Sequence, residues 1–125
     1  NNHIIGDNNP TYIIAEMSAN HAGSINRAKE IIHAAKESGA DCIKIQTYTP
    51  DTLTIDCDNE YFNVKNGTWG GEKLYDLYKK AYTPWEWQAE LYDTAKKVGL
   101  CNFISVHFVT TTAETIVREN CYEQG

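Results

Sequence analysis

The stretch DCIKIQT, residues 41–47, is the segment on which the fold and the candidate site both depend. Ile43 and Ile45 are apolar. The positions that follow them hold Lys44 and Gln46. This alternation has the period of a β-strand, in which successive side chains point to opposite faces. The run therefore predicts a strand that buries its isoleucines and presents an amine and an amide on its other face. An exposed edge strand with a polar face is the plainer alternative.

Two other short runs have strand character, and helical patterns separate all three. These runs are YIIAEM at residues 12–17 and NFISV at residues 102–106. Residues 25–35 repeat apolar side chains at helical spacing, with Ser24 before them as an N-cap and Gly39 after them as a stop. Alternating strands and helices predict an α/β fold with a parallel sheet.

The sequence TPWE at residues 83–86 predicts the start of a second helix. Thr83 can cap it, Pro84 suits the first helical position and Glu86 can close a capping box. A third helix is expected to start at residues 111–114.

Residues 48–82 are too many for an ordinary connection between a strand and a helix. They contain a helical pattern of their own, formed by Leu74, Leu77, Tyr78 and Ala81. Parallel α/β folds place their substrate contacts beyond the C-terminal ends of the strands. We therefore expect this insertion to border a binding site.

Three strands do not complete any common parallel fold. An eight-stranded (β/α)8 TIM barrel typically needs about 250 residues, and a three-stranded parallel sheet leaves an open edge. We therefore expect residues 1–125 to be the N-terminal part of one TIM-barrel domain, with about three βα units and a long insertion after the second strand. A compact three-layer domain built from three such units is the alternative.

Charge and cysteine content narrow the class of protein. A net charge of −6 at pH 7 argues against a nucleic-acid or anionic-membrane surface, although a few cations at a site can still bind an anionic small molecule. The four cysteines have neither zinc-site nor CxxC spacing, so we expect reduced thiols in a cytoplasmic protein. No apolar run approaches the roughly 18 residues that a membrane helix needs.

Glu16 is the least expected residue of its run, because a carboxylate near the end of a buried strand is costly unless it is paired or functional. We predict that Glu16, Lys44 and Gln46 converge at the C-terminal ends of adjacent strands and bind a polar, anionic substrate. A structural ion pair between Glu16 and Lys44 is the alternative. His21, in the loop after the first strand, is expected to cap or pack rather than to bind a metal or a substrate.

Several motifs together resemble the sialic acid synthase family. They are IIAE at residues 13–16, SANHAG at 18–23, GAD at 39–41 and IKIQT at 43–47. The stretches at residues 48–54, 74–78 and 81–87 look most like the branch of that family that makes pseudaminic acid. The resemblance runs from about Tyr12 to Phe103.

The resemblance implies a phosphoenolpyruvate-dependent transferase. Its reaction is the condensation of phosphoenolpyruvate with an amino sugar, a 2,4-diacetamido-2,4,6-trideoxyhexose, to give pseudaminic acid, a nonulosonic acid. Glu16 then matches the catalytic glutamate near the sugar, Lys44 the phosphoenolpyruvate-binding lysine, and Gln46 a sugar-contacting glutamine. Asn20 and Ser105 are expected among the substrate-binding residues.

The resemblance also implies features that lie outside residues 1–125. A divalent metal, Mn or Mg, is expected to polarise the sugar aldehyde, with no ligands in this chain, and the full-length protein is expected to be a homodimer. Val106 departs from the family, which has a phosphate-binding hydroxyl there. We therefore expect residues 1–125 alone to be inactive. An N-acetylneuraminate or legionaminic acid synthase of the same family, or a non-catalytic barrel fragment, remains the alternative.

Overall fold

A computed structural model describes residues 4–106 of the chain, with side chains through residue 101. Its three strands are β1 (Ile14–Glu16), β2 (Cys42–Thr47) and β3 (Cys101–Val106). They form one sheet in the order β1-β2-β3, and both neighbouring pairs are parallel. The three predicted strands and their parallel arrangement are confirmed. The helix start expected at residues 111–114 lies outside the described residues.

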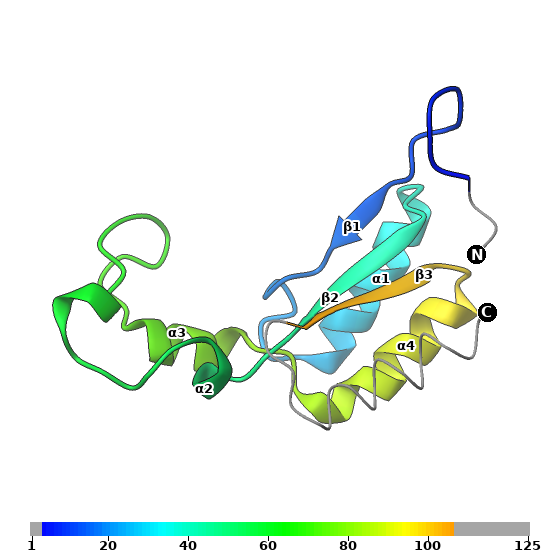
Figure 1. Ribbon diagram of the computed structural model, residues 1–125. Coiled ribbons are helices and arrows are strands. Elements are labelled where there is room, and N and C mark those ends of the chain that lie inside the picture. Colours follow the sequence, from blue (N-terminus) through cyan, green and yellow to red (C-terminus); the bar gives the residue numbers. More distant parts are fainter. Residues whose placement is uncertain (1–3, 107–125) are drawn as a thin grey trace.

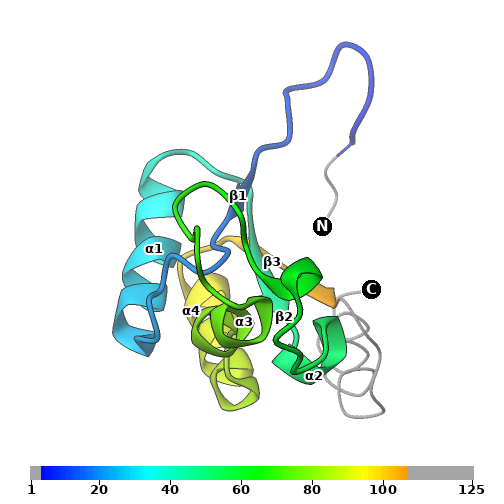
Figure 2. The ribbon, with the colours of Figure 1, turned by 90° about the vertical axis from the view of Figure 1, so that its left-hand side faces the viewer.

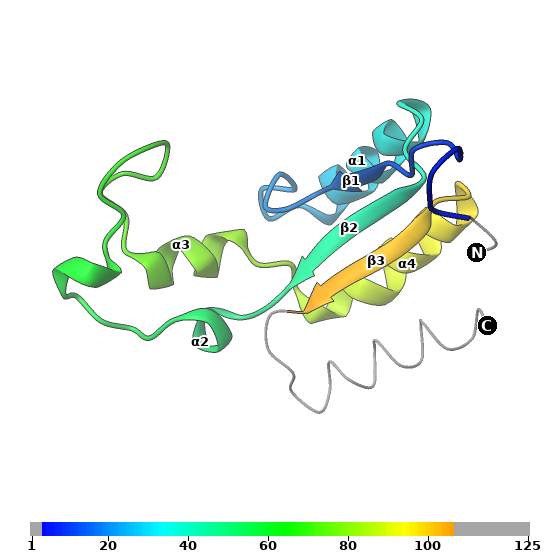
Figure 3. The same cartoon turned by 45° about the horizontal axis from the view of Figure 1, so that its top comes forward.

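Two helices cover one face of this sheet, as Figure 1 and Figure 3 show. They are α1 (Ile25–Glu37) and α4 (Gln88–Lys97). Ile43 and Ile45 of β2 are fully buried in the core that these helices form with the sheet. The helices contribute Ala28, Ile32, Ala35, Leu91 and Ala95 to this core. The alternation within residues 41–47 therefore has its predicted consequence, with both isoleucines turned toward the helices.

The helix α1 begins and ends where local chemistry predicts. The Ser24 hydroxyl oxygen accepts a hydrogen bond from the Arg27 backbone N–H, which satisfies one of the free donors of the first turn. The helix ends at Glu37, and Gly39 takes a left-handed conformation with φ of +86°. Glycine suits this position because its φ carries no Cβ penalty.

The predicted start of the second helix is wrong in one respect. Residues Trp85–Trp87 form a short 3-10 turn, η2, and α4 begins only at Gln88. No side chain caps η2 or α4. The Thr83 hydroxyl lies instead 3.3 Å from the Nε2 atom of His21, so a contact distant in sequence takes the place of the local cap.

The insertion after β2 lies beyond the C-terminal ends of the strands. It contains α2 (Pro50–Leu53), a 3-10 turn η1 (Glu60–Phe62) and α3 (Leu74–Ala81), the last confirming the predicted helical pattern. Figure 2 views the molecule from this side and shows α2 and α3 in front of the sheet. The insertion therefore occupies the end of the fold at which parallel α/β proteins bind substrates.

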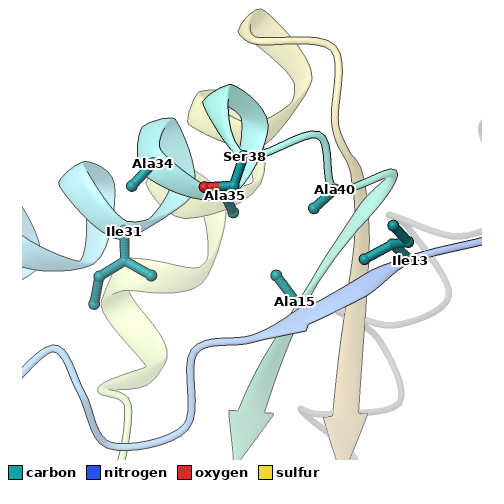
Figure 4. A pocket seen from close by; sticks show the side chains of 7 residues that line it. All are labelled: Ile13, Ala15, Ile31, Ala34, Ala35, Ser38 and Ala40. Atoms are coloured by element: carbon teal, nitrogen blue, oxygen red, sulfur yellow. The ribbon is translucent and has the colours of Figure 1, made fainter.

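The outer side of β1 is apolar and open. A groove of about 340 Å³ runs between β1 and α1, and Figure 4 shows its lining. Ile13 and Ala15 contribute from the strand side, and small side chains, mainly alanines, from α1. Ile13 and Ile14 are each about half exposed.

Within residues 4–106, no helix has the length and apolar character required to cross a membrane.

Candidate functional site

Three polar side chains meet at the C-terminal ends of β1 and β2. The Lys44 Nζ atom donates to Glu16 Oε2 at 3.0 Å, and Gln46 Nε2 donates to Glu16 Oε1 at 2.8 Å. Glu16 pairs with Lys44 in the strand register, so both side chains project from the same face of the sheet. The convergence predicted from the two sequence patterns is therefore present.

This polar cluster lies on the sheet face opposite the helices. Ile43 and Ile45 point toward α1 and α4, and the intervening positions point the other way. The side chains of Lys44 and Glu16 keep 28% and 43% of their exposure. Ion pairs this exposed typically contribute only about 0–1 kcal/mol to stability. Stability alone is thus a weak reason for placing these charges here.

Lys44 and Gln46 both have hydrogen-bonding groups that Glu16 does not use. A lysine ammonium has three donors, and only one of them is used by Glu16. Gln46 donates through its amide nitrogen, which turns its amide oxygen away from the carboxylate. The cluster therefore offers a cation with spare donors beside an amide acceptor, which suits a ligand with both an anionic group and hydroxyls.

Asn20 lies in the loop between β1 and α1, close along the chain to Glu16. Its side-chain amide donates to the Met17 carbonyl at 2.9 Å, and its own backbone carbonyl accepts from Arg27 Nε at 2.9 Å. The described contacts thus hold the loop together. The substrate-binding role expected for Asn20 stays a prediction.

Ser105 lies in β3 at the position paired with Gln46 in the parallel register. The Ser105 backbone therefore lies next to Gln46, on the strand that neighbours β2. Its side chain lies outside the described residues, as does His107. The neighbouring Val106 pairs with Thr47.

Tyr48 follows β2 directly and is a residue that the sequence patterns did not single out. It is 5% exposed, and its ring meets that of Tyr78 edge-on, with centroids 5.8 Å apart. Burial raises the pKa of the Tyr48 phenol. Residue 48 continues the alternation of residues 44 and 46, so this pattern could have identified Tyr48 from the sequence. The contact joins the end of β2 to α3 of the insertion.

The described residues do not assemble a metal centre. Among residues 4–106, no group of three or more His, Cys, Asp or Glu side chains is placed to hold an ion. The divalent metal expected for the full-length protein stays a prediction.

Comparison with known proteins places these features in a family. The model of the NeuB family matches residues 31–122 of the chain. Over 94 residues the chain is 54% identical to a pseudaminic acid synthase of Campylobacter jejuni, covering 75% of this chain and 27% of the relative. A pseudaminic acid synthase of Helicobacter pylori is 46% identical over 112 residues, which cover 90% of this chain and 33% of that protein.

A solved structure has a similar fold. The chain superposes on the crystal structure of an N-acetylneuraminic acid (sialic acid) synthetase from Leptospira borgpetersenii, solved in complex with citrate, with a TM-score of 0.67 and 23% identity. The superposition covers 94% of this chain and 38% of that structure. The chain thus spans about a quarter to a third of the length of the curated relatives described above. Because the family model matches most of its residues, this chain belongs to the NeuB family.

Proposed function

We propose that this chain forms the N-terminal part of a synthase that condenses phosphoenolpyruvate with a 2,4-diacetamido-2,4,6-trideoxyhexose to give pseudaminic acid. The observation that carries the proposal is the cluster of Glu16, Lys44 and Gln46 at the C-terminal strand ends. The identity of 54% to a pseudaminic acid synthase supports the choice of sugar. In this proposal, residues 1–125 belong to a longer polypeptide, the complete synthase.

The same proposal includes a (β/α)8 barrel, of which residues 1–125 supply the first strands. The half-exposed Ile13 and Ile14 support this, because a strand with large apolar side chains at an open edge is suited to a further strand and helix. The groove between β1 and α1 is lined largely by small side chains, so it can receive larger apolar side chains from such a helix.

In this proposal, Lys44 pairs with the phosphate of phosphoenolpyruvate. The spare donors of its ammonium offset the charge of the phosphate as water is excluded from the site. The enol carbon of phosphoenolpyruvate attacks the aldehyde carbon of the open-chain sugar, and the aldehyde oxygen takes the electron pair of the broken π bond and a proton to become a hydroxyl. Water adds to the resulting cation and loses a proton, and phosphate then leaves as the ketone forms. The Lys44 ammonium is well suited to hold the phosphate through these steps.

Gln46 and Glu16 contact the sugar in the same proposal. The amide oxygen of Gln46 accepts from a sugar hydroxyl, and the carboxylate of Glu16 fixes the orientation of that amide. Metal dependence, a homodimer and a cytoplasmic location stay predictions for the complete synthase.

The test is the substrate requirement of the complete synthase. We expect phosphate release from phosphoenolpyruvate only when the 2,4-diacetamido sugar is present, with kcat/KM at least about 100-fold higher than with N-acetylmannosamine, since unfilled polar contacts strongly reject a wrong sugar. Equal or greater activity with N-acetylmannosamine would favour the N-acetylneuraminate synthase alternative. Absence of phosphate release with every amino sugar, from a folded protein supplied with manganese, would exclude the synthase proposal.

A further inference from the structure

His21 is a fully buried histidine in the loop that follows β1. Its Nδ1 atom accepts a hydrogen bond from the Gly23 backbone N–H at 3.1 Å. An accepting Nδ1 carries no proton, so a neutral ring must carry its proton on Nε2. The Nε2 atom lies 3.3 Å from the Thr83 hydroxyl oxygen and can therefore donate to it.

This contact connects two segments that are 62 residues apart in the sequence. Thr83 is itself 1% exposed and lies where the insertion returns to η2 and α4. Trp87 meets the His21 ring edge-on, with centroids 5.5 Å apart. The imidazole thus fastens the loop after β1 to the end of the insertion.

The same loop starts at the candidate site. The Met17 backbone N–H donates to the Lys44 carbonyl at 3.0 Å, which extends the pairing of β1 and β2 past Glu16. The Ser24 N–H donates to the His21 carbonyl at 2.9 Å. Ser18 and Ala22 both take left-handed conformations, with φ of 50° and 48°. A loop with two strained residues needs surrounding contacts to hold its shape, and His21 supplies them from its centre.

We propose that His21 is a positioning residue: as a neutral imidazole it bridges Gly23 and Thr83, holds the loop beside Glu16 in its binding conformation, and releases that loop when it becomes protonated. A protonated ring cannot accept from Gly23, so the backbone N–H loses its partner and a charge is left in a buried place. The part of the proposal that concerns catalysis rests on the proposed function.

The surroundings of His21 favour the neutral form. Burial lowers the pKa of His21. The charged or titratable groups on the elements packed against it, tyrosine aside, are Arg27, Lys29, Glu30, His33, Lys36 and Glu37 of α1, Glu86 of η2, and Glu90, Asp93, Lys96 and Lys97 of α4. Arg27 bonds the Asn20 carbonyl and Lys29 pairs with Glu90. Burial rather than any of these charges causes the shift.

The sign of the pH effect follows from this shift. In the unfolded chain His21 has its ordinary pKa of about 6.5. The contribution of the neutral imidazole to stability is fully present above that value and is lost as pH falls from there toward the lower folded pKa. Acidification below about pH 6.5 should therefore weaken the loop first.

The first test is nuclear magnetic resonance of the 125-residue chain at neutral pH. Long-range nitrogen–proton spectra should show His21 as the Nε2–H tautomer, with Nδ1 unprotonated. A Nδ1–H tautomer, or a protonated ring at pH 7, would overturn the proposal.

The second test is the pH dependence of unfolding by urea. The wild-type midpoint should fall between about pH 7 and pH 5. In His21→Asn the amide oxygen can replace Nδ1 but cannot titrate, so the midpoint should fall markedly less over this range. His33→Gln, at an exposed histidine of α1, is the matched control and should behave as wild type. Equal pH dependence in His21→Asn and wild type would contradict the proposal.

The third test uses the complete synthase and separates positioning from chemistry. Thr83→Val removes the hydroxyl at nearly constant shape and should lower kcat/KM for the sugar about 5- to 10-fold, the loss expected for one buried hydrogen bond. Thr83→Ser should restore it to within about 2-fold. Unchanged kinetics in Thr83→Val would overturn the positioning role. A complete synthase without activity would refute the proposed function, while the spectroscopic and unfolding tests would still decide the bridge itself.

Discussion

At the scale of single residues, Glu16 organises the candidate site. One carboxylate oxygen accepts from Lys44 and the other from Gln46, so a single side chain on β1 fixes two side chains on β2. Neither partner is deeply buried, and all three side chains lie on the face away from the helices. The arrangement fits a site in which the carboxylate orients groups that bind substrate.

The first residue-scale prediction is that Glu16→Gln impairs use of the sugar. The substitution keeps the shape, but it removes the charge and replaces one acceptor oxygen by an NH2 group, so residue 16 can no longer accept from both Lys44 and Gln46. Hydrogen bonds to charged groups contribute about 1.5–3 kcal/mol, so kcat/KM for the sugar should fall about 10- to 150-fold in the complete synthase.

A matched control is available for this substitution. Glu90 also pairs with a lysine, Lys29, but it does so between α1 and α4, away from the polar cluster. Glu90→Gln should therefore leave the kinetics within about 2-fold of wild type, since exposed ion pairs contribute little. If both variants lost the same activity, the effect of Glu16→Gln would reflect general destabilisation and the assignment would fail.

At the scale of elements, local signals predicted some boundaries and missed others. The start of α1 was predictable because Ser24 and Arg27 are three residues apart and form the cap between themselves. The start of α4 was not, because the Thr83 hydroxyl contacts His21 instead. A cap depends on neighbours that the sequence places side by side, whereas the competing contact exists only after the chain folds.

The element-scale prediction concerns β2, on which both the core and the site depend. Ile45 is fully buried between the sheet and the helices. Ile45→Ala should lower the free energy of unfolding by about 2–5 kcal/mol, through lost burial and an unfilled cavity. Urea unfolding followed by circular dichroism would measure the change.

Ile55 is the matched control for this substitution. It lies in the insertion and is 61% exposed. Ile55→Ala should therefore change stability by less than about 0.5 kcal/mol. Similar losses in both variants would mean that the helices do not pack on the β2 isoleucines as described.

At the scale of the whole molecule, the architecture could be predicted from the sequence, whereas the contacts that surround the site could not. Parallel pairing of β1 with β2 follows from the alternation of strands and helices, and convergence of Glu16 with Lys44 and Gln46 follows from that pairing. The contact between Tyr48 and Tyr78 does not follow, because it depends on how a long insertion folds back on the end of β2. No periodicity in the sequence encodes that path.

Steady-state kinetics of Lys44→Ala in the complete synthase, with phosphoenolpyruvate varied, would show directly whether Lys44 binds the phosphate. The pair in question is Lys44 with the phosphate of bound phosphoenolpyruvate, from which water is excluded in the proposed complex. Removing one partner of such a pair typically costs about 2–5 kcal/mol, or roughly 30-fold to several thousand-fold, and we expect kcat/KM for phosphoenolpyruvate to fall by at least about 100-fold. The KM for the sugar should change much less, and Lys44→Arg should restore activity only in part.

Lys29 supplies the control, because its side chain is 29% exposed against 28% for Lys44 and is likewise paired with a glutamate. We expect wild-type kinetics for Lys29→Ala beside the large loss for Lys44→Ala. A Lys44→Ala enzyme with unchanged kinetics toward phosphoenolpyruvate would contradict the assignment of Lys44 to the phosphate, and would reduce Lys44 to a structural partner of Glu16.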